Sequence, residues 1–237
     1  MFVGHLGVAL GTKAVAPKVP LGSLVAAAFF LDLVWPVLLL VGVEQVRIDP
    51  GNTAFTPLAF TYYPFSHSLM MAWVWGILVG LFAAWRGLGP LAGLVLCGTV
   101  ISHWILDLIT HRPDLPLRPD GPSFGLGLWN SIAGTIGVEG LLFGAAVWLY
   151  ARRSTPSDGI GRWALWTLVG LVTAIWLSGP WSPPPPSELA VALVGLSMWL
   201  FPVWAGWIER HRPSVDSTRD AGSSDAIADV NAARRTR

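Results

Sequence analysis

The stretch Leu88–Thr110, which reads LGPLAGLVLCGTVISHWILDLIT, decides the fold class of this chain. It is long enough to cross a bilayer as one helix, because a spanning helix needs about 20 largely apolar residues. Its single charged residue is Asp107, which follows His103 by four positions. A carboxylate at the bilayer centre costs roughly 2.5–3.5 kcal/mol on insertion scales. At this spacing the two side chains share one helix face, about 5–6 Å apart at Cβ, close enough to bind one metal ion or to hydrogen-bond each other.

The composition of the whole chain points to a membrane protein. Of its 237 residues, 53% are hydrophobic and only 12% are charged, whereas a soluble domain is about 25% charged. The formal net charge of +1 argues against a nucleic-acid-binding platform, which needs a basic face. The single cysteine, Cys97, excludes an intrachain disulfide and a cysteine-based zinc site. The start of the chain lacks a basic segment, which argues against a removable signal peptide.

Hydropathy predicts an all-α, polytopic membrane bundle of about six to seven helices, the first of them short. The short stretch is Phe2–Ala16, either a marginal span or a helix that enters the bilayer part-way. The predicted spans are Leu21–Val43, Ser68–Trp85, Leu88–Thr110, Phe124–Tyr150, Trp163–Ser178 and Glu188–Trp207. Pro36 is expected to kink the span Leu21–Val43, because proline breaks the local hydrogen-bond ladder.

The chain divides into one membrane-embedded domain, residues 1–211, and a tail, residues 212–237. The tail is rich in Ser, Asp, Ala and Arg without apolar periodicity, which predicts disorder. Eight basic residues fall on one set of alternate loops: Lys13, Lys18, Arg86, Arg152, Arg153, Arg162, Arg210 and Arg212. The other set holds three: Arg47, Arg112 and Arg118. The positive-inside rule therefore places the tail in the cytoplasm and the protein in the cytoplasmic (inner) membrane.

With this topology, five polar side chains from four helices are expected to meet near the outer leaflet. They are His5, Asp32, His67, His103 and Asp107. Imidazole and carboxylate ligands suit zinc, and also manganese or iron. The alternative to a metal site at His103 and Asp107 is a structural His–Asp hydrogen bond that bridges two helices. His67 alone could be an interfacial surface residue, and Asp32 alone could serve in helix packing or on an ion path.

A second set of polar residues lies downstream. Ser131, Thr135 and Glu139 recur at i, i+4 and i+8, which predicts a polar stripe facing the bundle interior. Glu139 is interpreted either as a further ligand or general base, or as a buried acid hydrogen-bonded to Thr135 or to a facing helix. His111 follows a helix end, where it either lines the pocket mouth or interacts with the helix dipole.

Four motifs carry a resemblance to a known family. They are Gly4-His5-Leu6-Gly7, Phe30-Leu31-Asp32-Leu33, Ser66-His67-Ser68-Leu69 and Ser102-His103-Trp104-Ile105-Leu106-Asp107-Leu108-Ile109-Thr110. In this order they resemble the bacterial family of membrane-bound metal-dependent hydrolases, over roughly residues 1–117. That family is distantly similar to zinc-dependent phospholipases C and single-strand-specific zinc nucleases, which have helical folds around a metal cluster.

The resemblance implies that His5, Asp32, His67, His103 and Asp107 are metal ligands, with Asp107 bridging two ions. The chain departs from the pattern in two respects. Members often carry a proline-aspartate pair and a second acid at the Asp32 motif, and the distant relatives use a further downstream His-x-x-x-Asp/Glu pair. No histidine lies between His111 and His211. These departures favour one or two metal ions over three.

The predicted function is metal-dependent hydrolysis of a phosphoester or lipid-like substrate that diffuses in the bilayer. Asp107 and Glu139 are the predicted catalytic residues, with Glu139 or a ligating aspartate taking the proton from water. Trp104 and Trp129 are expected to line an apolar access path. Arg112 and Arg118 are either phosphate contacts or ordinary loop residues. The alternative is a small metal-ion or proton transporter using the same cluster. Transporters tend to show internal repeats, and none is visible here. A purely structural protein is disfavoured by the one-sided clustering.

Overall fold

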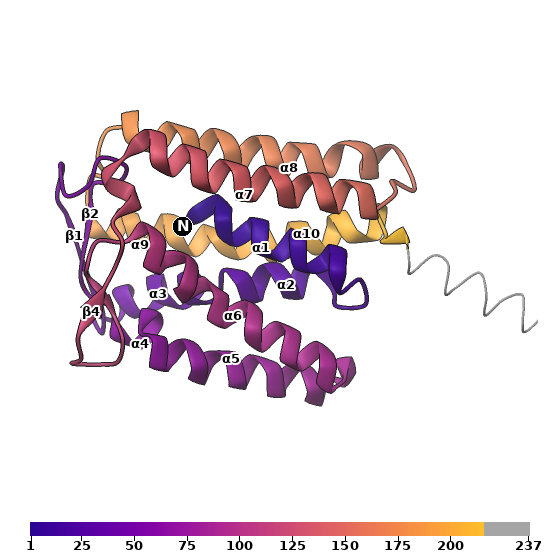
Figure 1. Cartoon of the computed structure of the whole chain (residues 1–237), viewed down its shortest axis with the longest axis horizontal. Coiled ribbons are helices and arrows are strands. Elements are labelled where there is room, and N and C mark those ends of the chain that lie inside the picture. Colours follow the sequence, from indigo (N-terminus) through magenta and orange to yellow (C-terminus); the bar gives the residue numbers. More distant parts are fainter. Residues whose placement is uncertain (216–237) are drawn as a thin grey trace, which may run out of the picture.

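The computed structural model describes residues 1–215, which form a bundle of helices packed side by side (Figure 1). Within these residues, five helical segments are long and apolar enough to cross a membrane, or up to six if a bent pair counts as one span. The helices are α1 (Phe2–Val15), α2 (Leu21–Ala28), α3 (Phe30–Leu40), α4 (Pro64–His67), α5 (Leu69–Ala83), α6 (Pro90–Thr110), α7 (Ile132–Arg153), α8 (Gly159–Ser178), α9 (Glu188–Leu196) and α10 (Leu200–His211). This confirms the predicted helical bundle and its short first helix.

The predicted span Leu21–Val43 is not a single helix kinked at Pro36, so that prediction is wrong. The chain bends by 55° between α2 and α3, at Phe29, and Pro36 lies inside α3. The last carbonyl groups of a helix lack partners within it. At this break the Ala28 carbonyl accepts a hydrogen bond of 2.7 Å from Nδ1 of His103 in α6. A buried side chain from another helix therefore stabilises the bend.

Glycine allows α5 and α6 to approach very closely. A Cβ atom added at Gly80 would lie 2.6 Å from the carbonyl oxygen of Gly93, and one added at Gly93 would lie 2.6 Å from that of Gly80. No larger residue fits at either position without moving the backbone. This contact fixes the position of α6, the helix that carries His103 and Asp107.

Short strands cover one end of the bundle, which we call the strand-bearing end (Figure 1). Strands β1 (Gln45–Ile48) and β2 (Leu58–Tyr62) pair antiparallel, as do β3 (Leu115–Pro116) and β4 (Ser123–Phe124). The predicted helix start at Phe124 is wrong, because α7 begins only at Ile132. Gly127 has a left-handed φ of +75°, and the Ser131 side chain caps α7 by accepting from Gly134 N–H. These two residues separate the strand segment from the helix.

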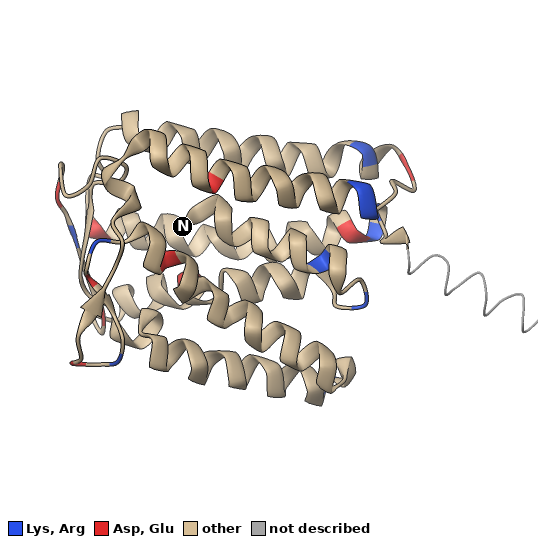
Figure 2. Ribbon diagram, viewed as in Figure 1, with Lys and Arg blue, Asp and Glu red and all other residues tan. Residues whose placement is uncertain are grey.

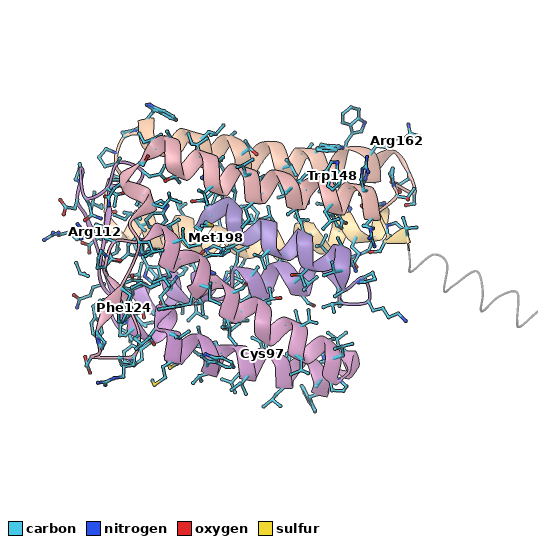
Figure 3. All side chains as sticks on the ribbon, in the orientation of Figure 1. Cys97, Arg112, Phe124, Trp148, Arg162 and Met198 are labelled. Atoms are coloured by element: carbon cyan, nitrogen blue, oxygen red, sulfur yellow. The ribbon has the colours of Figure 1, made fainter. Side chains whose placement is uncertain are left out.

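The opposite end, which we call the basic end, is held by buried charged groups. The Lys13 ammonium, 3% exposed, donates to the carbonyl groups of Pro17 and Val19 and contacts the Glu209 carboxylate. Figure 2 shows that Lys and Arg lie toward the two ends of the bundle, whereas acidic residues also occur inside the helices. Arg162 and Trp148 lie at the basic end and Arg112 and Phe124 at the other (Figure 3).

The first residues of the predicted tail belong to the described structure. Arg212 is buried and donates to the Ser154 hydroxyl and to the Ala151 carbonyl. Ser214 forms an antiparallel bridge with Ser154. The rest of the predicted tail, residues 216–237, lies outside the described residues.

Candidate metal centre

The five predicted ligands come together in one buried cluster. His5 lies on α1, Asp32 in the first turn of α3, His67 at the end of α4, and His103 and Asp107 on α6. Two overlapping groups, His5–His103–Asp107 and Asp32–His67–His103, have their nitrogen and oxygen atoms within 4.8 Å of one another. The expected convergence of these side chains is therefore confirmed, and either group has the composition of a metal site.

Asp107 is the centre of the cluster and is only 2% exposed. Its Oδ1 atom lies 3.1 Å from Nε2 of His5, and its Oδ2 atom lies 3.1 Å from Nε2 of His103. Nε2 of His67 is 3.9 Å from the same Oδ2 atom. The Met1 amino group also contacts Oδ1. The carboxylate thus faces imidazoles on both oxygens, which is an arrangement suited to bridging cations.

Asp32 lies on the side of the cluster that is least buried. Its Oδ1 atom lies 3.4 Å from Nε2 of His67 and 3.7 Å from Nε2 of His103. The Asp32 side chain is 25% exposed, whereas those of His67 and His103 are 4% and 0% exposed. Asp32 is therefore the most exposed of the five clustered side chains.

His67 is held by a chain of buried groups that the sequence analysis missed. Its Nδ1 atom lies 2.7 Å from the Ser66 hydroxyl, which donates to Oε2 of Glu44 at 2.6 Å. The other oxygen of Glu44 accepts the backbone N–H groups of Phe65 and Ser66. Because the carboxylate only accepts, the Ser66 hydroxyl accepts in turn from His67 Nδ1–H. In the neutral imidazole this leaves Nε2 of His67 with a lone pair that faces the cluster.

His103 is fixed in the same tautomer by a different partner. The Ala28 carbonyl can only accept, so Nδ1 of His103 carries the proton. In the neutral imidazole Nε2 is then an acceptor, and it faces the oxygens of Asp107 and Asp32, which are also acceptors. Among the described residues this fully buried atom has no hydrogen-bond partner. An orphaned acceptor between carboxylates is an unfavourable arrangement unless a cation lies there.

His111, whose role the sequence left open, faces the same carboxylate. Its Nδ1 atom lies 3.0 Å from Oδ1 of Asp114, and its Nε2 atom lies 4.0 Å from Oδ2 of Asp107. The Tyr63 hydroxyl donates to the same Asp114 oxygen at 3.2 Å. Burial, together with the charge of Asp114, raises the pKa of Tyr63 well above its usual value, so the phenol stays protonated. Four of the five histidines of the chain therefore gather around Asp107.

His5 differs from the other three imidazoles. Its ring stacks on that of His103 with the centroids 3.6 Å apart and the planes 6° from parallel. Its Nδ1 atom is buried and has no hydrogen-bond partner among residues 1–215. His5 therefore lacks the fixed second hydrogen bond that orients His67, His103 and His111.

Glu139 lies outside both candidate ligand groups. It is fully buried on α7, where the Trp129 indole and the Gly4 backbone N–H approach its carboxylate without meeting strict hydrogen-bond geometry. Thr135 is not the partner of Glu139, because its hydroxyl donates to the carbonyls of Leu128 and Ser131 instead. The alternative partner, a facing helix, is represented by the Gly4 N–H of α1. Ser131 caps α7 by accepting from Gly134 N–H. Ser131, Thr135 and Glu139 therefore do not hydrogen-bond one another along a shared polar stripe.

The tryptophan and arginine residues singled out in the sequence have separate locations. Trp104 is buried and donates to the Pro116 carbonyl at 3.1 Å, so it anchors β3 and does not line an access path. Trp129 packs on His111 and lines a cavity with Glu139. Arg118 lines a hollow of about 170 Å³ with Tyr63 and Asp114. Arg112 lies 3.8 Å from Asp114 and is 42% exposed.

The donor set fits a transition-metal ion. Three imidazoles present Nε2 lone pairs while their Nδ1 atoms are committed to Ser66, Ala28 and Asp114. Metal-ligating histidines almost always make such a second hydrogen bond, which fixes their tautomer. Comparison of the chain with family models, curated proteins and solved structures finds no match in any of the three.

Proposed function

We propose that this chain is a membrane-embedded metal-dependent hydrolase that acts on a phosphoester or lipid-like substrate. One observation carries the proposal. The Nδ1 atoms of His67, His103 and His111 are hydrogen-bonded, and their Nε2 atoms lie within 4.0 Å of the Asp107 carboxylate, in a cluster buried among apolar helices. The resemblance of the four N-terminal motifs to membrane-bound metal-dependent hydrolases supports the same function.

The proposed ligands are His5, Asp32, His67, His103 and Asp107, and the nitrogen-rich set favours zinc, with one or two ions. A bound divalent ion supplies a water of lowered pKa and polarises a phosphoryl oxygen. His111 is positioned to join the set through Nε2, which lies on the same side of Asp107 as His67 and His103. This adds a candidate ligand that the sequence left open.

Three acidic residues of the chain would have separate roles in the reaction. Asp107 holds the imidazoles around one point, and the part-exposed Asp32 leaves an opening for substrate and water. A carboxylate oxygen outside the ligand set accepts the proton of the attacking water. Glu139 is the candidate, since it is a buried acid outside both candidate ligand groups.

The location of the cluster supports a lipid-like substrate. The site lies among helices that are long and apolar enough to span a membrane, beneath the strand-bearing end. Arg118, in the hollow beside Tyr63 and Asp114, is placed to contact a phosphate group. With the basic end and the tail in the cytoplasm, as the charge distribution predicts, the site faces the extracytoplasmic leaflet of the inner membrane.

A transporter using the same cluster is the competing function. A transporter would need a series of polar side chains that leads from the cluster through the bundle to the basic end. The charged groups described there, buried Lys13 and part-exposed Glu209, bind each other and nearby backbone groups. They serve as a clamp between α1, α2 and α10, which favours the stationary site of an enzyme.

Hydrolysis is tested with the purified full chain in nanodiscs, assayed on a panel of phosphoesters and phospholipids. We expect turnover that is abolished by a chelator and restored by zinc. His103→Ala should lose it, whereas the same substitution at His211, which bonds Asp158 at the other end, should retain it. Metal retained by the wild type without hydrolysis of any substrate would overturn the hydrolase proposal in favour of transport.

A further inference from the structure

A groove of about 470 Å³ opens between α2 and α5, and none of the five proposed metal ligands lines it. Both helices pack against α6, whose buried Leu96 forms the floor of the groove. Small side chains leave this space, since Ala26 and Ala27 line it on α2 and Ala83 lines it on α5. The volume falls within the ~300–1,000 Å³ typical of small-molecule sites. The groove therefore has room for an organic ligand.

The groove is apolar along the length of α2. Its lining follows the chain from Pro20 to Phe30, which is roughly 15 Å at 1.5 Å per helical residue. That length is about half of the ~30 Å hydrocarbon core of a bilayer, which is the depth of one leaflet. Apart from Ser23 and Arg86, every residue that lines the groove is apolar. The groove thus suits an acyl chain, which is hydrocarbon and needs no hydrogen-bond partner.

One charged residue lies at the end of this apolar groove. Arg86 belongs to the turn Ala84–Leu88 between α5 and α6, at the basic end of the bundle (Figure 1). Its guanidinium carbon lies 5.7 Å from the centroid of the Phe82 ring, which also lines the groove. Among residues 1–215 no carboxylate lies within ion-pair distance of Arg86. The aromatic contact therefore holds an unpaired cation beside the groove.

The combination of an apolar groove and a terminal cation selects the class of ligand. Arginine binds phosphate groups with two parallel N–H···O bonds. Basic pockets between membrane helices on the cytoplasmic side bind anionic lipid headgroups. A zwitterionic lipid would bring a second cation toward Arg86, which is unfavourable. With the basic end in the cytoplasm, as the charge distribution predicts, the groove opens to the leaflet whose surface is negatively charged.

We propose that this groove binds one anionic phospholipid, with an acyl chain against Ala27, Val79 and Leu96 and the phosphate at Arg86. Ala27 directly precedes Ala28, whose carbonyl group accepts the hydrogen bond from His103. The bound chain therefore packs on the turn of α2 that leads into the bend between α2 and α3. The site requires neither a metal ion nor hydrolytic activity.

Separate variants test the headgroup contact and the groove. Arg86→Gln removes the charge of an exposed side chain, and Arg162→Gln is its matched control, because Arg162 is also exposed at the basic end (Figure 3). Ala26→Leu places a branched side chain in the groove from a half-buried position, and Ser23→Leu does the same one turn earlier. Ala145→Leu, at an exposed position of α7, is the control for both.

The experiment is native mass spectrometry of the full chain in detergent, with phosphatidylglycerol or phosphatidylcholine that carry identical acyl chains. We expect one phosphatidylglycerol per chain, bound about fivefold more tightly than phosphatidylcholine, the factor expected of one basic residue at an anionic headgroup. Arg86→Gln should remove this preference, and Arg162→Gln should keep it. Ala26→Leu and Ser23→Leu should weaken the binding of both lipids, whereas Ala145→Leu should weaken neither.

Equal affinity of the wild type for the two lipids would overturn the proposal, and so would a preference that survives Arg86→Gln. A dimer of the chain that dissociates in Ala26→Leu would assign the groove to a second copy instead. The lipid site and the metal centre fail separately, because they share no residue. Selective lipid binding by a protein without metal would retain the groove and overturn the hydrolase, and hydrolysis without lipid preference would do the reverse.

Discussion

Nδ1 of His103 donates to the Ala28 carbonyl over 2.7 Å, so the same hydrogen bond joins the bend of the α2–α3 pair to the candidate metal centre. The bend places Asp32, in the first turn of α3, beside His103 on α6. The bond also directs the Nε2 lone pair of His103 toward Asp107. One hydrogen bond therefore stabilises the bend in the fold and also fixes the tautomer of His103, a proposed ligand.

The Glu44–Ser66–His67 chain should be necessary for tight metal binding. Ser66→Ala removes the acceptor that fixes His67 Nδ1–H. Glu44→Gln presents an amide donor to Ser66, which reverses the chain and moves the imidazole proton to Nε2. We expect either variant to lower metal affinity about 10–100-fold, the range found for outer hydrogen-bond partners. Competition with a chromophoric chelator measures the Kd.

Glu188→Gln is the control for this prediction, because Glu188 is an exposed acid at the start of α9. It should bind metal like the wild type. An unchanged Kd in both Ser66→Ala and Glu44→Gln would show that the chain does not position His67.

The contact between α5 and α6 should be intolerant of added volume. Gly80→Ala places a Cβ atom 2.6 Å from the Gly93 carbonyl oxygen, so the helices must separate. Overpacking of this kind costs about 1–3 kcal/mol. Gly98→Ala, on α6 with no atom within 4 Å of the added Cβ, should not destabilise the fold. Thermal unfolding in detergent compares the two variants, and equal midpoints would contradict the close packing.

The cap of α8 should give a defined pH dependence. The backbone N–H of Gly161, and next His211, hydrogen-bond Asp158 and lower its pKa. A lowered folded-state pKa means that the stabilisation is complete above the ordinary value of 3.8 and is lost as the pH falls below it. Asp158→Ala should therefore unfold at a lower temperature than the wild type at neutral pH. The difference should shrink in acid, and a constant difference across pH would contradict this assignment.

The sequence alone predicted most of the helices and the convergence of the site, for identifiable physical reasons. Helical spacing placed His103 and Asp107 on one face. Long apolar runs gave the spans, so residues near corresponding helix ends were expected to meet. Asp32, His67 and His5 meet this expectation in the structure.

Features that depend on contacts distant in sequence were not predicted. The bend at Phe29 is stabilised by His103, 75 positions from Ala28. Glu44 lacks a local motif, and its role depends on the fold bringing it 2.6 Å from the Ser66 hydroxyl. The ligand residues themselves were therefore predictable from helix spacing and helix ends. The groups that orient the histidines were not, because they are distant from them in the sequence or lack a motif.

The central claim is that the buried cluster binds a metal ion, and elemental analysis of the purified full chain tests it most directly. We predict one or two transition-metal ions per chain in the wild type. Asp107→Ala should remove most of the metal, because Asp107 contacts the imidazoles of both His5 and His103. Asp49→Ala, which changes an exposed acid in the loop after β1, should retain it. A well-folded wild-type protein without metal would contradict the claim.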